Sequence, residues 1–277
     1  MKRLWSLLAL VVLTACTGDS AAPHLARGNV LVNNGKLQEA AAEYREAAKL
    51  SPKSTVARER LGDTLYDLGR KDEALLAYRS ATELEKGAVT ARIGAARVLA
   101  DKGDFAGAQS ELTLALQQAP SNLYALLSRG NLHAKMGDKK AALADYEQAV
   151  HLKSDNVPAL YQYGLALLEV GQVPEAGTTF DRILKLAPES PEGFYGRARY
   201  FAARNEGAFA AEALAEAQKR IEADARARLS EQGFKGKDLE EGVARTTRRS
   251  LEELQREPAF AKWAHDPGFR RTVGWLP

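Results

Sequence analysis

Cysteine is almost absent from this chain of 277 residues, since Cys16 is the only one and no disulfide can form within the chain. Histidine is also scarce, and its residues lie far apart without the spacing of metal ligands. The four histidines are His24, His133, His151 and His265. The sequence therefore predicts no metal site and no bound cofactor.

An excess of one charge sign is missing as well. The 39 Lys and Arg residues nearly balance the 36 Asp and Glu residues, which leaves a formal net charge of +3 at pH 7. A dedicated nucleic-acid-binding domain would need a basic face of one sign. The balanced composition is typical of solvated helical surfaces and argues against nucleic acid as a partner.

Motifs of known catalytic sites are absent too. The sequence has no nucleophile elbow, phosphate loop, HExxH pair or paired cysteines. The glycines and lysines of segment 233–237 lack both the spacing and the following Ser or Thr of a phosphate loop. Neighbouring carboxylates such as Glu240 and Glu241 do not indicate a catalytic site, because a charged helix contains many such pairs. We expect no catalytic residues and no enzymatic activity; an enzymatic role of the C-terminal tail is the weakest alternative.

Long hydrophobic runs are limited to one short stretch at the N-terminus. Leu4 to Leu13 is apolar and follows Lys2 and Arg3. A helix that spans a bilayer needs about 20 apolar residues, so this run is too short. A basic start followed by a short apolar run indicates a signal peptide over residues 1–15.

The apolar run ends in Leu13-Thr14-Ala15-Cys16, which resembles the lipobox of bacterial lipoproteins. The resemblance implies a diacylglycerol lipid on the Cys16 thiol and cleavage before it. The alternative is an ordinary secretory signal that happens to contain a cysteine. Thr17 stands where retention in the inner membrane would call for aspartate, so the resemblance implies an outer-membrane lipoprotein facing the periplasm. Residues 16–20 form a tether of about 20 Å at most.

A period of 34 residues organises the rest of the chain. Frames that start at Ala21, Thr55, Val89, Leu123, Val157 and Pro191 follow one another without insertion or deletion. Their twentieth places are all alanine: Ala40, Ala74, Ala108, Ala142, Ala176 and Ala210. Their fifteenth places carry glycine in five frames, where a left-handed residue would end the first helix of each pair. These are Gly35, Gly69, Gly103, Gly137 and Gly171.

This pattern closely resembles the tetratricopeptide repeat family. The resemblance implies an all-α, right-handed superhelical solenoid of six helix-turn-helix repeats over residues 21–220. We expect residues 221–277 to form a helical cap on the last repeat, because the open end of a solenoid must be covered.

The family also implies a concave groove, lined by the second, fifth, ninth, twelfth and thirteenth places of each repeat. Its candidate partner-binding residues are Asn29, Tyr66, Arg97, Tyr124, Asn131, Tyr161, Tyr195 and Arg199. Tyrosine and arginine often dominate interface energetics. The alternative is that the tyrosines pack within or between repeats. Leu25 and Leu127 stand where family members that clamp a C-terminal carboxylate carry lysine, so that partner class is excluded.

The last 70 residues depart from the repeat pattern. We expect a long helix from about Ala208 to Leu229, then a helix that Asp238 and Glu241 start as a capping box. Two acidic-proline pairs predict two short helices near the C-terminus. Their apolar residues are Phe260, Trp263, Phe269, Val273 and Trp275.

The lipobox, short tether and six repeats are similar in layout to the pilotin-type lipoproteins of type IV pili. That resemblance implies a periplasmic scaffold that assists assembly of an envelope machine, such as a pilus secretin, through protein partners. A related possibility is the repeat lipoprotein of tight-adherence pili. The alternative function is an adaptor that gathers peptidoglycan hydrolases or proteases at the envelope.

Overall fold

The computed structural model describes residues 20–274 and contains only helices within that range. Fourteen α-helices and one 3-10 helix follow one another along the described chain. The predicted all-α fold of six helix pairs with a helical C-terminal extension is confirmed. The predicted signal peptide, Cys16 and Trp275 lie outside the described residues.

The chain divides into two compact units, and the first ends at Leu132. Helices of this unit pair as α1 with α2, α3 with α4 and α5 with α6, and consecutive pairs also pack on one another. Their bounds are α1 Ala22–Asn33, α2 Leu37–Leu50, α3 Thr55–Asp67, α4 Lys71–Leu84, α5 Val89–Asp101 and α6 Phe105–Gln118. The next helix, α7 (Leu123–Lys135), contains the division between the units.

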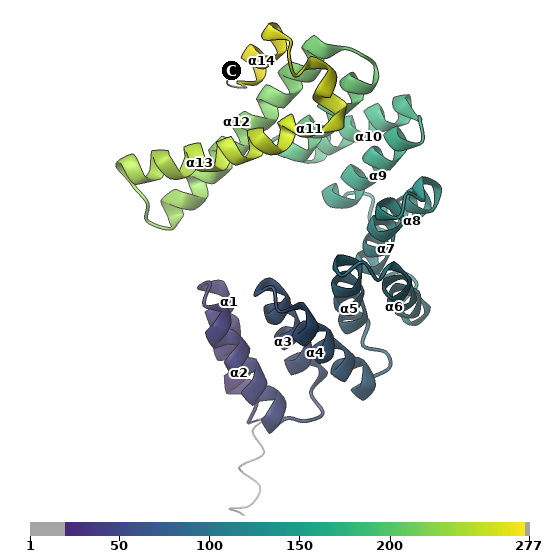
Figure 1. Ribbon diagram of the computed structural model, residues 1–277, viewed down its shortest axis with the longest axis vertical. Coiled ribbons are helices and arrows are strands. Elements are labelled where there is room, and N and C mark those ends of the chain that lie inside the picture. The colour runs from purple at the N-terminus through teal and green to yellow at the C-terminus, as the bar shows by residue number, and fades with distance from the viewer. Residues whose placement is uncertain (1–19, 275–277) are drawn as a thin grey trace, which may run out of the picture. The chain divides into compact units, whose positions relative to one another are not determined.

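The second unit starts at His133 and holds the remaining repeats and the C-terminal extension. Its repeat helices are α8 Lys139–Leu152, α9 Val157–Glu169, α10 Val173–Leu186, α11 Pro191–Ala203 and α12 Gly207–Glu231. The extension consists of α13 Gly236–Gln255, the 3-10 helix η1 Pro258–Trp263 and α14 Pro267–Val273. Figure 1 shows α13 running back along α12, against which it packs.

Local sequence determines where the helices start and stop. Side-chain oxygens of Ser54, Asn122 and Asn156 accept hydrogen bonds from backbone N–H groups at the starts of α3, α7 and α9. All five glycines at the fifteenth place have positive φ angles between 72° and 84°. The sixth repeat has Asn205 there, at φ 64°, because asparagine tolerates the left-handed region better than most residues. Turn chemistry therefore repeats with the same 34-residue period.

The core of each repeat forms around a small residue and a bulky apolar side chain, which is an aromatic ring in four of the six repeats. The alanines at the twentieth place are at most 2% exposed. Tyr78 and Phe180 at the twenty-fourth place are fully buried, and each lies against glycines of two successive repeats. A Cβ atom on Gly164 would lie 2.5 Å from the Phe180 ring, and one on Gly196 would lie 2.0 Å from it. The ring therefore joins successive repeats only because both positions lack a side chain.

The C-terminal extension caps the last repeat with apolar side chains. Phe260, Phe269 and Val273 are at most 4% exposed and form one cluster with residues of α11 and α12. Trp263 stacks on Phe269 with 5.4 Å between ring centroids. The two predicted short helices are present, although the first of them is a 3-10 helix. Asp266 starts the second by accepting a hydrogen bond from Phe269 N.

The predicted start of the preceding helix is wrong. The helix α13 begins at Gly236, so Asp238 lies in its first turn rather than before it. Gly236 has a φ angle of 55°, and Leu239 N donates to the Lys235 carbonyl. The two glycines of the turn reverse the chain sharply enough for the helix to begin three residues before Leu239, the first residue after the predicted cap. The Asp238 carboxylate then favours the positive end of the helix dipole instead of capping it.

Candidate functional site

The eight candidate groove residues divide between the two units. Asn29, Tyr66, Arg97, Tyr124 and Asn131 belong to the first unit, and Tyr161, Tyr195 and Arg199 belong to the second. Every one of them lies on the first helix of its repeat. The two sets have different surroundings.

Hydroxyl groups of the core rings reach the groove in the first unit. Tyr44 donates a hydrogen bond to Asn29 Oδ1 at 2.7 Å, and Tyr78 donates one to Asp63 Oδ1 at 2.6 Å. Burial raises the pKa of both tyrosines. For Tyr78 the hydrogen bond to Asp63 raises the pKa further. The phenols therefore remain protonated donors, and each ring fixes the polar side chain at the ninth place of its own repeat.

Tyr66 and Arg97 are brought together in the same unit. The Arg97 guanidinium carbon lies 3.9 Å from the centroid of the Tyr66 ring. Arg97 also donates to the Tyr78 hydroxyl at 3.3 Å and lies 3.6 Å from Asp63. Tyr66 in turn donates from its hydroxyl to Asp101. A cation over an aromatic face is favourable, so this network holds Arg97 in place while leaving its side chain 47% exposed.

Acidic residues dominate this part of the first unit. Burial raises the pKa of Glu59, and the nearby Asp63 adds to the effect. Asp101 accepts a hydrogen bond from Tyr66 and lies 3.8 Å from Lys71, and Arg97 lies 3.6 Å from Asp63. The region is therefore a polar surface suited to hydrogen bonding rather than to burial of large apolar groups.

Tyr124 and Asn131 lie two helical turns apart on α7. The Tyr124 side chain is 72% exposed, the largest value among the exposed large hydrophobic residues of the described chain. Asn131 is also exposed at the surface. A ring as open as Tyr124 is available for contact with a partner.

The three candidates of the second unit lie under the chain's own C-terminal extension. The Tyr195 hydroxyl is 2.8 Å from Ser250 Oγ of α13. Arg199 donates two hydrogen bonds to Glu257, at 2.7 and 3.0 Å. Tyr161 packs against Phe180 with 6.3 Å between ring centroids, so the packing alternative applies to this tyrosine. Burial raises the pKa of Tyr161 and Tyr195.

Arg199 is the most constrained charge of this region. Burial opposes its charge, but the hydrogen bonds to Glu257 and the field of nearby acidic groups outweigh this cost and raise its pKa. It therefore remains a cation. A guanidinium that meets a carboxylate through two parallel hydrogen bonds is both strong and directional.

Two adjoining cavities open beside Arg199, each of about 390 Å³. They share Leu165, Glu169 and Arg199, so they form one continuous depression, here called the Arg199 trough. The trough is defined by Leu165, Leu168, Glu169, Arg199, Ala202 and Glu257. Its apolar part comes from α9 and α11, and its charged rim from the Arg199–Glu257 pair and the Lys139–Glu169 pair, the latter 2.7 Å apart. This combination fits a segment that offers both apolar and polar groups.

Glu257 and Lys139 were missed as trough residues by the sequence prediction. The Glu257-Pro258 pair was interpreted only as a helix start, and η1 does begin at Pro258. No local pattern indicates that the Glu257 carboxylate reaches an arginine 58 residues earlier. The sequence did not show that Arg199 is only 26% exposed, and it is this partial burial that makes a carboxylate partner favourable for its guanidinium.

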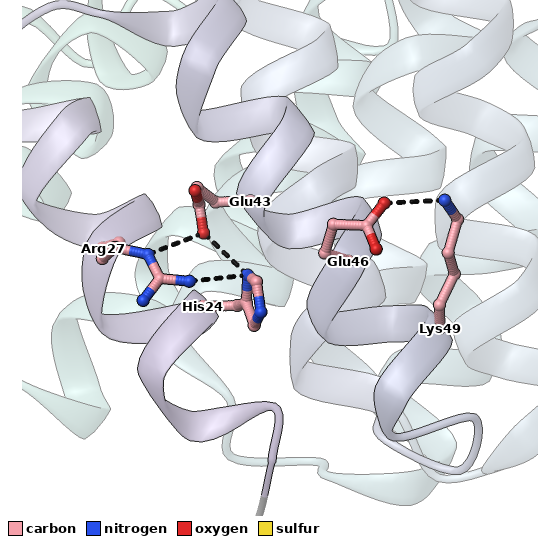
Figure 2. A network of polar contacts seen from close by, with 5 residues as sticks. All are labelled: His24, Arg27, Glu43, Glu46 and Lys49. Atoms are coloured by element: carbon pink, nitrogen blue, oxygen red, sulfur yellow. Dashed lines mark hydrogen bonds and ion pairs between the residues drawn. The ribbon is translucent and has the colours of Figure 1, made fainter.

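A separate polar cluster joins the helices of the first repeat. In Figure 2, Glu43 of α2 faces His24 and Arg27 of α1, with distances of 2.8 Å to His24 Nδ1 and 3.0 Å to Arg27 Nε. The hydrogen bond with His24 lowers the pKa of Glu43, and Arg27 lowers it further. On the same helix Lys49 donates to Glu46 at 2.7 Å. The cluster ties α1 to α2 and needs no ligand to explain it.

The described residues hold neither a metal-binding cluster nor a membrane-spanning helix. Residues 20–274 contain no group of three or more His, Cys, Asp or Glu residues that could hold a metal ion. Over the same range, every helix is too short or too polar to cross a bilayer. The trough combines apolar walls with two ion pairs, which gives it a binding chemistry.

Comparison with known proteins gives one family. Two family models, both described as tetratricopeptide repeat, match the chain; the first covers residues 25–89 and 93–158 and the second covers residues 133–200. A comparison with curated proteins gives no match.

Solved structures agree with the family models. A tetratricopeptide repeat protein from Parabacteroides merdae is 17% identical with a TM-score of 0.60, over 93% of this chain and 98% of that one. The pilF protein of Pseudomonas aeruginosa is 15% identical with a TM-score of 0.61, over 70% and 88% of the two chains. YrrB, described as having an unusual peptide-binding site, is 24% identical with a TM-score of 0.50, over 64% and 91%. At these identities the likeness establishes the fold.

Proposed function

Because the chain belongs to the tetratricopeptide repeat family, we propose that it is a scaffold that binds a segment of a protein partner in the Arg199 trough. Proteins of this family mediate protein–protein interactions. The observation that carries the proposal is the trough itself, where two adjoining cavities with apolar and polar walls lie beside the partly buried Arg199–Glu257 pair. Pockets that combine apolar walls with a few fixed polar groups are typical binding sites.

We further propose that the scaffold is tethered to the outer membrane through a lipid on Cys16 and works in the periplasm. The lipobox-like end of the signal sequence supports this, and so does the short tether before the first repeat. The partner is then an envelope protein, such as a subunit of a type IV pilus secretin. The fold likeness to pilF is compatible with this role but, at 15% identity, does not establish it.

The test is photo-crosslinking in intact cells from a single position in the trough. A photoreactive amino acid replaces Leu168, which lines the trough, and the matched control replaces Leu186, which is 46% exposed on α10 and does not line the trough. We expect capture of a secretin or pilus subunit, identified by mass spectrometry, from position 168 only.

Two outcomes would contradict the proposal. Equal capture from both positions, or capture from position 186 alone, would show that the trough is not the site. Capture of peptidoglycan hydrolases or proteases from position 168 would retain the trough but replace the pilus assembly role with that of a hydrolase adaptor.

A further inference from the structure

The C-terminal extension contacts the last two repeats in two different ways. Its final part is anchored by apolar burial, with Phe260 and Val273 each 1% exposed. In the preceding helix α13, Val243 is 3% exposed, and the partly buried Leu251 packs against the same apolar cluster as Phe260 and Val273. Polar contacts with the repeats come from Ser250 on Tyr195 and, just after the helix, Glu257 on Arg199.

An open depression remains beside the end of α13. It has a volume of about 270 Å³ and is lined by Tyr161 and Tyr195 of the repeats and by Ser250, Glu253 and Glu257 of the extension. The segment therefore covers two of the predicted groove tyrosines without filling the space above them.

The polar contacts of this segment are partly exposed. The Arg199 and Glu257 side chains are 26% and 27% exposed, so the hydrogen bonds between them are accessible to a competing carboxylate. At its other end, α13 is joined to α12 by a turn with two glycines at positive φ and by ion pairing of Arg226 with Glu240. Release of the end of α13 would break the contacts of Ser250, Leu251 and Glu257, while Phe260 keeps the remainder of the extension in place.

We propose that residues 247–257 are an internal occupant of the groove of the last two repeats, and that a partner segment displaces them by placing its own carboxylate on Arg199. This rests on the function proposed above and names the recognised chemistry. The partner is an amphipathic helix that ends in Asp or Glu followed by small apolar residues, as the chain's own Glu257-Pro258-Ala259 does. The cationic Arg199 binds the carboxylate, and Leu165 and Leu168 accept the apolar residues.

Competition from an internal segment reduces the apparent affinity for the partner by the fraction of molecules in which the groove is open. Loss of the Glu257 charge should raise that fraction. A purely structural role of the Arg199–Glu257 pair would have the opposite effect, because breaking it would damage the site. The two roles therefore predict changes of opposite sign.

The experiment uses the full chain and a fluorescein-labelled peptide of residues 247–260 as the probe. Fluorescence anisotropy gives the Kd of the peptide for the wild type and for Glu257→Gln, with Glu252→Gln as the matched control, since Glu252 is an exposed glutamate of the same helix. We expect Glu257→Gln to bind the peptide roughly tenfold more tightly, as follows if the internal segment covers the groove about nine-tenths of the time. The control should bind like the wild type, and Arg199→Gln should lose binding.

Hydrogen exchange provides the second readout. In Glu257→Gln the amides of residues 247–255 should exchange faster, while those of α14 keep their protection. Equal peptide affinity in the wild type and Glu257→Gln, weaker affinity in Glu257→Gln, or no binding to either would each overturn the proposal. In those cases, crosslinking from position 168 to an envelope protein would still support the proposed function. Failure of the internal-occupant proposal can therefore be distinguished from failure of the proposed function.

Discussion

Small residues are required for stability wherever a buried ring at the twenty-fourth place of a repeat lies against them. Tyr78 is fully buried and lies between Gly62 of its own repeat and Gly94 of the next. A Cβ atom would lie 2.6 Å from the ring at Gly62 and 2.4 Å from it at Gly94. Gly62 stands at the predicted small position, whereas Gly94 was not identified from sequence. The structure thus adds a second small position at this junction, and Gly196 holds the same place beside Phe180.

Gly94→Ala should therefore destabilise the first unit. Alanine gains about 1 kcal/mol over glycine in a helix interior, but the clash with a fixed ring costs about 1–3 kcal/mol or more. We expect a net loss of about 1–2 kcal/mol in the free energy of unfolding, measured by denaturant titration. Gly87→Ala is the control, because its Cβ would have no atom closer than 4.0 Å. Equal stability of the two variants would contradict the role of Gly94.

The repeat helices and the helices of the C-terminal extension are held in place by different contacts. The repeat helices pair with their neighbours in sequence, and each pair repeats the same turn and the same small-to-large contact. The extension follows other rules, since η1 and α14 join residues of α11 and α12 through a shared apolar cluster. The 3-10 helix has Phe260 as its one buried residue, so the attachment of this element depends largely on a single ring.

Phe260→Ala should detach η1 and α14 from the last repeat. Removal of a buried phenylalanine side chain costs about 3–5 kcal/mol, and we expect a loss of that size from the second unit, measured by denaturant titration. Hydrogen exchange should show lost protection in α14 but not in α9 or α10. Phe234→Ala is the control, because Phe234 is 44% exposed. If both variants lost the same stability, the cap would not depend on this anchor.

At the scale of the whole molecule, each unit has its own contacts and its own kind of surface. The first presents a polar, acid-rich face around Arg97, and the second contains the Arg199 trough. In repeat proteins stability is approximately a sum of local terms, so a variant in one unit should leave the other largely folded. This separation allows the binding experiments on the second unit to be interpreted without reference to the first.

The proposed membrane tether makes a prediction about the molecule as a whole. Cys16→Ala should move the protein from the outer-membrane fraction to the soluble periplasmic fraction, because two or more acyl chains anchor a protein firmly and none would remain. Membrane flotation followed by immunoblotting measures this, with Thr17→Ala as the control that retains the cysteine. A Cys16→Ala protein that still floats with outer membranes would refute the lipid anchor.

The sequence alone predicted the features that depend on residues close to one another in the chain. The 34-residue period predicted the helix pairs, the left-handed turn glycines and the small positions, because helix starts, turns and close crossings are specified within a few residues. The start of α13 was predicted three residues late, since the geometry of its glycine turn is not encoded in a capping pattern.

Only the tertiary structure decided what covers the last two repeats. Tyr195 and Arg199 were predicted as open groove residues, yet they meet Ser250 and Glu257, which are 55 and 58 residues away in the chain. Those contacts exist because Phe260 inserts beside α11 and α12 and brings the preceding residues over the groove. Such placement depends on the packing of distant apolar surfaces, for which the sequence carries no period.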